Sequence, residues 1–64
     1  SSIHIEINQP ALISLIDMLG RKVYSKEVYS SLTIDLKYLE NGVYNINISD
    51  LQSENKQSIR AVKN

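Results

Sequence analysis

Few side chains in this sequence could support catalysis. The chain of 64 residues contains one histidine, His4, and no cysteine, whereas a nucleophile needs a base within hydrogen-bond distance. His4 lies between Ile3 and Ile5, so we expect its ring to face solvent or a sheet edge. We predict a protein that is not an enzyme and that has no cofactor.

The carboxylates are scattered along the chain. Asp17, Asp35, Glu40 and Asp50 each lie where a turn or a strand end can use a carboxylate locally, and the sequence places none of them opposite another. Residues 49–55 have the composition of an oxygen-ligand calcium loop, but not its ligand spacing. We therefore predict no metal site.

The charge balance argues against two classes of protein. Seven basic and seven acidic residues give a net charge of zero, and the cations form no stripe of the kind that binds nucleic acid. No apolar run approaches the roughly 20 residues that span a bilayer. We expect no nucleic-acid partner and no membrane-spanning segment.

Alternating apolar and polar residues indicate strands in three places. The alternation covers residues 3–7, residues 32–36 and residues 43–49. A period of two is that of a strand with one buried face. In the last of these strands, Tyr44, Ile46 and Ile48 would lie on one face.

The segment from Pro10 to Val28 admits two interpretations. One is a helix that ends at Gly20 and carries an apolar stripe at helical spacing. The other is a hairpin with strands at 11–15 and 21–28 and a turn at 17–20, where Asp and Gly occupy their favoured first and fourth positions and Gly20 starts a bulge. We favour the hairpin, because a lone helix of about ten residues is marginal in water and the neighbouring segments alternate.

The spacing Leu39-x-x-Gly42-x-Tyr44 resembles a tyrosine corner, in which a tyrosine hydroxyl bonds an upstream backbone group while its ring fills the core. Gly42 would let the chain turn, and Leu39 would pack beneath. The alternative is that Asn41 and Gly42 form a simple tight turn and that Tyr44 is an ordinary core residue.

A last hairpin would turn through residues 50–55 and return along residues 56–62. Lys56, Arg60 and Lys63 could form a basic face there that blocks unwanted edge pairing. About six short strands with turns at intervals of about 8 to 12 residues predict an all-β sandwich. A small α+β domain remains the alternative if residues 10–20 and 32–39 are helical.

Two motifs and the tail together resemble a known family. Residues 13–23 form an apolar strand followed by Asp17, two residues, Gly20, two residues and Val23, and residues 39–48 read Leu-x-x-Gly-Val-Tyr with alternating apolar residues after it. Ile34-Asp35-Leu36 matches an element between these motifs, and residues 58–64 resemble a short basic and apolar tail. This combination resembles the type A C-terminal sorting domain of cargo proteins of the type IX secretion system, found in Bacteroidetes.

The resemblance implies a fold and a role. The fold would be a small immunoglobulin-like antiparallel β-sandwich of about six to seven short strands. Residues 1–64 would be a single C-terminal sorting domain, a fragment of a larger secreted precursor with a covalently linked N-terminal cargo. The type IX outer-membrane translocon would recognise this non-catalytic address, and a sortase-like surface peptidase would then typically remove it and attach the cargo. The precursor would be exported, pass through the periplasm and reach the cell surface or the medium.

We expect two sets of residues to matter for this role. The first determines the fold and contains Asp17, Gly20, Val23, Leu39, Gly42 and Tyr44. The second contacts the translocon and contains Arg21, Lys22, Ile59, Arg60, Val62 and Lys63. The contact surface would centre on residues 44–64, because an open strand edge near a free terminus can dock by backbone pairing. We expect Lys63→Ala to leave the fold intact.

An alternative function is an immunoglobulin-like or fibronectin-like module for adhesion or carbohydrate contact, appended to a secreted enzyme. Such a module would bind its ligand unaided and would work inside a longer chain, whereas a sorting tag would work only at the C-terminus. Carbohydrate-binding sandwiches usually expose aromatic side chains, and this chain contains no Trp or Phe.

Overall fold

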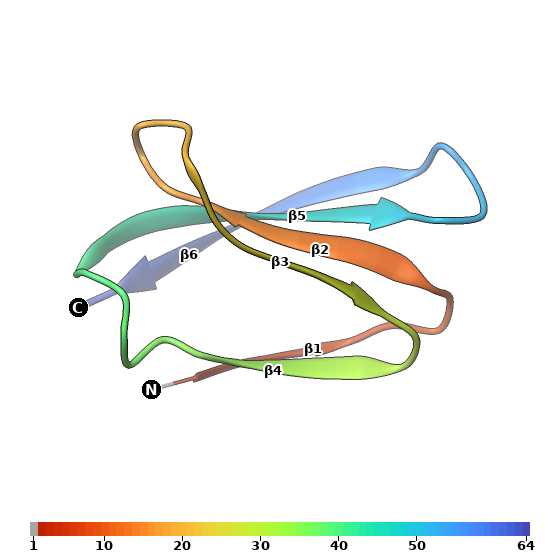
Figure 1. Ribbon diagram of the computed structural model, residues 1–64, viewed down its shortest axis with the longest axis horizontal. Coiled ribbons are helices and arrows are strands. Elements are labelled where there is room, and N and C mark those ends of the chain that lie inside the picture. Colours follow the sequence, from red (N-terminus) through yellow and green to blue (C-terminus); the bar gives the residue numbers. More distant parts are fainter. Residues whose placement is uncertain (1) are drawn as a thin grey trace.

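A computed structural model describes residues 2–64, which form two antiparallel sheets packed face to face (Figure 1). The strands are β1 (Ser2–Glu6), β2 (Ala11–Ile16), β3 (Lys22–Val28), β4 (Ser31–Asp35), β5 (Gly42–Asp50) and β6 (Lys56–Lys63). One sheet has the order β3-β2-β5-β6, and the other pairs β1 with β4. The predicted all-β sandwich is confirmed, and the helical alternatives are wrong.

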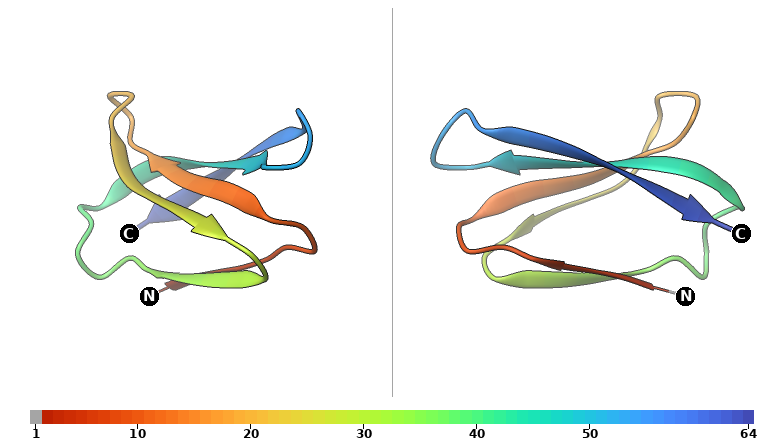
Figure 2. Two further views of the ribbon diagram at one scale, coloured as in Figure 1. Left: turned by 45° about the vertical axis from the view of Figure 1, so that its right-hand side comes forward. Right: turned by 180° about the vertical axis from the view of Figure 1, so that it is seen from behind.

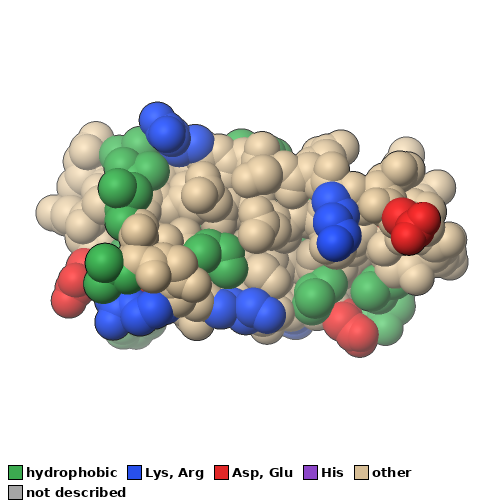
Figure 3. Space-filling model, turned by 90° about the horizontal axis from the view of Figure 1, so that it is seen from above, with side chains coloured by type: hydrophobic (Ala, Val, Ile, Leu, Met, Phe, Trp, Pro, Cys, Tyr) green, Lys and Arg blue, Asp and Glu red, His purple; other side chains and the backbone are tan. Residues whose placement is uncertain are grey.

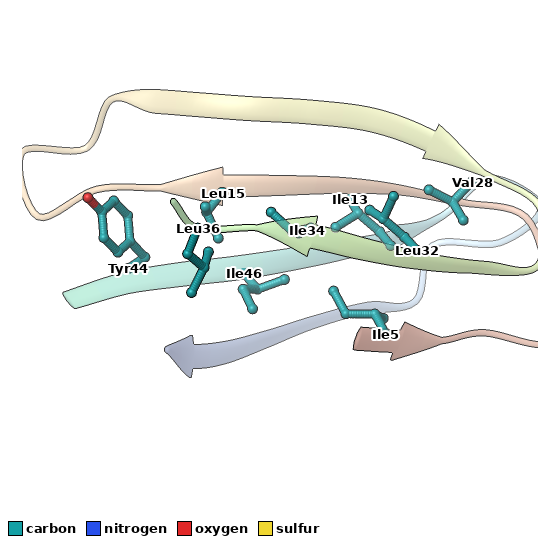
Figure 4. Packing of buried hydrophobic residues seen from close by; sticks show 9 residues of the cluster. All are labelled: Ile5, Ile13, Leu15, Val28, Leu32, Ile34, Leu36, Tyr44 and Ile46. Atoms are coloured by element: carbon teal, nitrogen blue, oxygen red, sulfur yellow. The ribbon is translucent and has the colours of Figure 1, made fainter. Parts of the chain in front are cut away.

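The core lies between the two sheets, where the inward residues of the alternating strands meet (Figure 4). Ile13 and Leu15 of β2 are fully buried, and Ile46 of β5 is only 2% exposed. They face Ile5 of β1 and Ile34 of β4 from the smaller sheet. Burying side chains of this size stabilises the fold by about 1.5–3 kcal/mol each, so the alternation is the main local signal for the sandwich.

Carboxylates that could have served a catalytic or metal site instead accept hydrogen bonds from nearby backbone amides. The carboxylate of Asp35 accepts a hydrogen bond from the Lys37 amide at 2.9 Å, and that of Asp50 accepts one from the Gln52 amide at 2.8 Å. His4 lies on the exposed face of β1, as expected. No helix within residues 2–64 is long and apolar enough to cross a membrane.

The two ends of the sandwich carry different loops. One end holds the turn between β2 and β3, the loop 36–41 and the last residues of β6, and we call it the corner end (Figure 1). β1 also begins there, on the side of the smaller sheet. Seen from behind, β6 and β1 lie along the same side of the sandwich (Figure 2). β6 is an edge strand.

Candidate functional site

The turn between β2 and β3 is organised by one carboxylate. Asp17 Oδ1 accepts hydrogen bonds from the amides of Leu19 at 2.9 Å and Arg21 at 2.8 Å, and Oδ2 accepts one from Arg21 Nε at 2.7 Å. The Gly20 amide donates to the Asp17 carbonyl, and the Asp17 amide donates to the Arg21 carbonyl. Gly20 has a φ of 82°, which glycine adopts without strain. The predicted hairpin with a glycine at the start of a bulge is confirmed.

These donors also set the ionisation of Asp17. The hydrogen bond from the Arg21 amide lowers the pKa of the Asp17 carboxyl most, and further hydrogen bonds from the Arg21 side chain and the Leu19 amide lower it too. Desolvation acts in the opposite direction but does not prevail. Asp17 is therefore a carboxylate at neutral pH, and its charge is paired with Arg21.

A second bulge follows in β3. Leu15 pairs with Tyr24 while Ile16 pairs with Lys22, so Val23 is an extra residue on this strand. Val23 is 40% exposed. Core packing therefore does not explain the place of Val23 in the motif.

The corner before β5 has the geometry that the spacing predicted. The Tyr44 hydroxyl donates to the Glu40 carbonyl at 2.6 Å, and Tyr44 is only 7% exposed. Leu39 packs partly buried against the core. Gly42 has a φ of 153°, a backbone conformation that other residues rarely adopt. The tyrosine corner is confirmed, and the alternative of a simple tight turn is wrong.

Sheet order brings part of the predicted recognition set together. In the four-stranded sheet, Lys22 pairs with Ile16, Ile16 with Asn45, and Asn45 with Arg60, so these residues form one cross-strand row on one face. Because side chains alternate, this is the outer face, opposite the buried Ile46. Lys22 and Arg60 are far apart in sequence, but they lie at the two ends of this row, on the two edge strands of the sheet. We call the row the basic row.

Val62 belongs to the same outer face. It pairs with Val43 at the corner end, beside the basic row, and is 54% exposed. Figure 3 shows this face, with hydrophobic side chains at its left, the corner end, where Lys and Arg side chains lie near them, and further hydrophobic side chains near the centre and at the lower right. Within residues 2–64, Lys22 and Arg60 form no ion pair.

Two members of the predicted set lie on the other face of β6. Ile59 pairs with Ile46 and points inward, yet it is 47% exposed because β6 is an edge strand. Lys63 pairs with Gly42, and its ammonium group donates to the carbonyls of Leu39 at 2.5 Å and of Lys37 at 3.3 Å.

The predicted basic face of the last strand is therefore wrong for Lys63. Lys56 and Arg60 point outward, but a period of two places Lys63 on the opposite face. Its ammonium group is bound to the corner loop instead of being free for a partner.

Exposed apolar residues of the turn and the corner loop are absent from the predicted set. Met18 and Leu19 are 74% and 78% exposed, and Tyr38 is 84% exposed. The sequence contains a signal for the first two, since they are large apolar residues at the centre of a predicted turn, where polar residues are usual.

A polar hollow of about 610 Å³ lies at the opposite end of the sandwich, beside Gln9, Asn55 and Gln57. None of its lining residues is aromatic. It therefore lacks the stacking surface that a carbohydrate-contact module usually provides.

Comparison with known proteins places the chain in a family. Residues 1–63 match the family described as the secretion system C-terminal sorting domain. No curated protein and no solved structure gives a significant match. The matched region includes the Asp17 turn, the Tyr44 corner and all of β6. The chain belongs to the family of C-terminal sorting domains of the type IX secretion system.

Proposed function

We propose that this domain directs a cargo, covalently linked to its N-terminus, to the type IX translocon and so across the outer membrane. The domain acts as a folded address and not as a catalyst. The family match over residues 1–63 carries this proposal. The local structure supports it, because the family motifs form the Asp17 turn and the Tyr44 corner, which stabilise the fold and contain no catalytic arrangement of groups.

The translocon binds the corner-end part of the outer face of the four-stranded sheet and the adjoining edge of β6, so Lys56, at the far end of β6, lies outside the contact. The basic row provides two cations, Lys22 and Arg60, that lack an ion-pair partner within the described residues. Val62 adds an exposed apolar side chain beside them. The edge of β6 adds backbone groups that another strand can pair with, and Ile59 lies on this edge.

The steps after recognition follow from the same address role. The precursor crosses the periplasm, and a sortase-like surface peptidase removes the domain once it has crossed the outer membrane. We propose that the cut falls before the domain, as the family resemblance implies. The pairing of β1 with β4 from Ser2 onward supports this, because proteolysis concentrates at exposed loop tips and untied termini. The cargo is then attached to the cell surface or released.

A reporter assay tests the address function. Residues 1–64 are fused to the C-terminus of a reporter that carries an ordinary signal peptide, and its location is compared in a type IX-competent strain and a translocon-deficient strain. We expect reporter outside the cell only in the competent strain. Periplasmic retention of a folded fusion in both strains would contradict the proposal and favour the adhesion module.

The basic row is tested in the same assay with a charge-matched control. Lys22→Gln with Arg60→Gln removes the row, and Lys26→Gln with Lys56→Gln removes two exposed cations from the same two strands outside the row. We expect only the first pair to reduce export. Equal export of both pairs would exclude the basic row as a contact.

A further inference from the structure

The tip of the β2–β3 turn exposes two neighbouring apolar side chains that the turn itself does not need. Met18 and Leu19 are about three-quarters exposed. The hydrogen bonds of the turn come from the carboxylate and backbone of Asp17, the amides of the following residues and the side chain of Arg21. Polar residues at the tip would form the same turn, so turn formation does not explain why these two residues are apolar.

Other exposed apolar side chains lie around this tip. A hollow of about 340 Å³ at the corner end is lined by Met18 and Leu19 together with Val23, Tyr38 and Val43. Val62 pairs with Val43 at the same end. Five of the eight large apolar side chains that are exposed among residues 2–64 therefore lie here: Met18, Leu19, Val23, Tyr38 and Val62. Grouped exposure of this kind marks an interaction site more often than scattered exposure does.

The tip is also held in one conformation before any partner arrives. The three hydrogen bonds to the Asp17 carboxylate and the positive φ of Gly20 fix the backbone on both sides of Met18 and Leu19. A preorganised loop loses little conformational entropy when it binds. Methionine, with its unbranched thioether, adapts to the shape of a pocket.

The charges around the tip indicate the chemistry of the partner. Arg21 is 69% exposed at its side chain, although one of its nitrogens binds Asp17, and Lys22 begins the basic row next to it. The Lys37 Nζ atom lies 5.4 Å from the centroid of the Tyr38 ring. The hollow itself is lined by Arg21, by Asp17, which is paired with Arg21, and by Glu40. With the neighbouring Lys22, Lys37 and Lys63 and with Asp35, whose carboxylate binds the Lys37 amide, this end has four cations against three carboxylates. A partner with carboxylates around an apolar centre would complement this surface.

We infer that the β2–β3 turn is a docking element whose Met18 and Leu19 enter an apolar pocket, rimmed by carboxylates, on a partner protein. The inference rests on the proposed function, under which the partner belongs to the export machinery. The tip projects above the four-stranded sheet, whereas β1 begins at the same end in the smaller sheet below (Figure 1). A cargo linked before β1 therefore joins the domain on the other layer of the sandwich from the tip.

A shaped protein pocket fits this surface better than a lipid bilayer does. Two side chains bury less apolar area than one myristoyl chain, which by itself gives only marginal membrane binding. In a pocket, by contrast, a few well-packed apolar side chains can carry most of the affinity.

The test compares two double variants in the reporter fusion. Met18→Ser with Leu19→Ser removes the apolar tip, and Tyr29→Ser with Leu51→Ser removes two exposed apolar side chains, 69% and 45% exposed, elsewhere on the domain. We expect at least about a tenfold loss of export for the tip pair, an unchanged thermal midpoint, and normal export of the control pair. If the serine pair lowers the thermal midpoint, Met18→Gln with Leu19→Gln is used instead, because glutamine is closer in length to the side chains that it replaces.

Each other outcome contradicts the inference in a distinguishable way. Normal export of both the folded tip variant and the wild-type fusion would refute the docking element but leave the proposed function standing. No export of the wild-type fusion would refute the proposed function and this inference with it. Sedimentation of the purified domain with phosphatidylglycerol vesicles, lost in the tip variant, would assign the tip to a lipid surface. A dimer lost in the tip variant would assign it to a second copy of the chain.

Discussion

The side chain of Lys63 connects the last strand to the corner loop, and replacing it by methionine should destabilise the domain. The ammonium group donates to the carbonyls of Leu39 and Lys37. A hydrogen bond to a charged group contributes about 1.5–3 kcal/mol, and Lys63 is only half-buried, so water replaces part of the lost interaction. We expect a loss of about 1–2 kcal/mol in the free energy of unfolding, or about 5–15 °C in Tm for a domain of this size.

Urea unfolding followed by far-UV circular dichroism measures this change. Methionine retains most of the aliphatic stem of lysine, so mainly the ammonium contacts are removed. Lys56→Met is the control, because Lys56 lies on the same strand and is exposed. We expect a lower urea midpoint for Lys63→Met, an unchanged m-value and a wild-type midpoint for Lys56→Met. Equal midpoints for the two variants would refute the reasoning.

This contact changes how an export defect in a Lys63 variant should be interpreted. The sequence suggested that Lys63→Ala would leave the fold intact, whereas the structure gives the ammonium group two partners in the corner loop. Reduced export of a Lys63 variant can therefore follow from lost stability. Arg60, whose side chain points outward from the same strand, is the cleaner position at which to test a direct contact.

Three further predictions concern the turn and the corner. Tyr44→Phe removes the hydrogen bond to the Glu40 carbonyl and should lower the free energy of unfolding by about 1 kcal/mol; an unchanged urea midpoint would argue against a stabilising corner. Gly42→Val should lower the free energy of unfolding by about 1–3 kcal/mol through backbone strain at a φ of 153°, and export should fall because less of the domain is folded. A variant with the thermal stability of the wild type would contradict this prediction. The folded pKa of Asp17 is lowered, mainly by the Arg21 amide, so its stabilisation is complete above about pH 4, the unfolded pKa, and is lost as the pH falls through the folded pKa. The stability difference between wild type and Asp17→Asn should therefore stay constant above about pH 4 and shrink as the pH falls below that value, and a difference that remains constant in acid would contradict this linkage.

Most of the fold could be predicted from local patterns. Each expected strand boundary lies within one residue of the observed one, because alternation, the Asp17 turn and the Tyr44 corner are set by neighbouring residues. The candidate site could be predicted only in part. The sequence predicts Lys22 and Arg60 as contact residues, but their common row depends on β2 and β5 lying between β3 and β6. Strand order in a sheet is a property of long-range packing that no local pattern contains.

The sequence by itself determined the type of each element, the residues that close the turn and the corner, and the family of the chain. These features rest on interactions over a few residues, such as the bonds from Leu19 and Arg21 to Asp17. Only the tertiary structure decided which side chains remain for a partner. It bound the Lys63 ammonium group to a loop that lies more than 20 residues earlier, and it left Met18 exposed at the corner end. The physical reason is that exposure and pairing depend on which distant strands become neighbours.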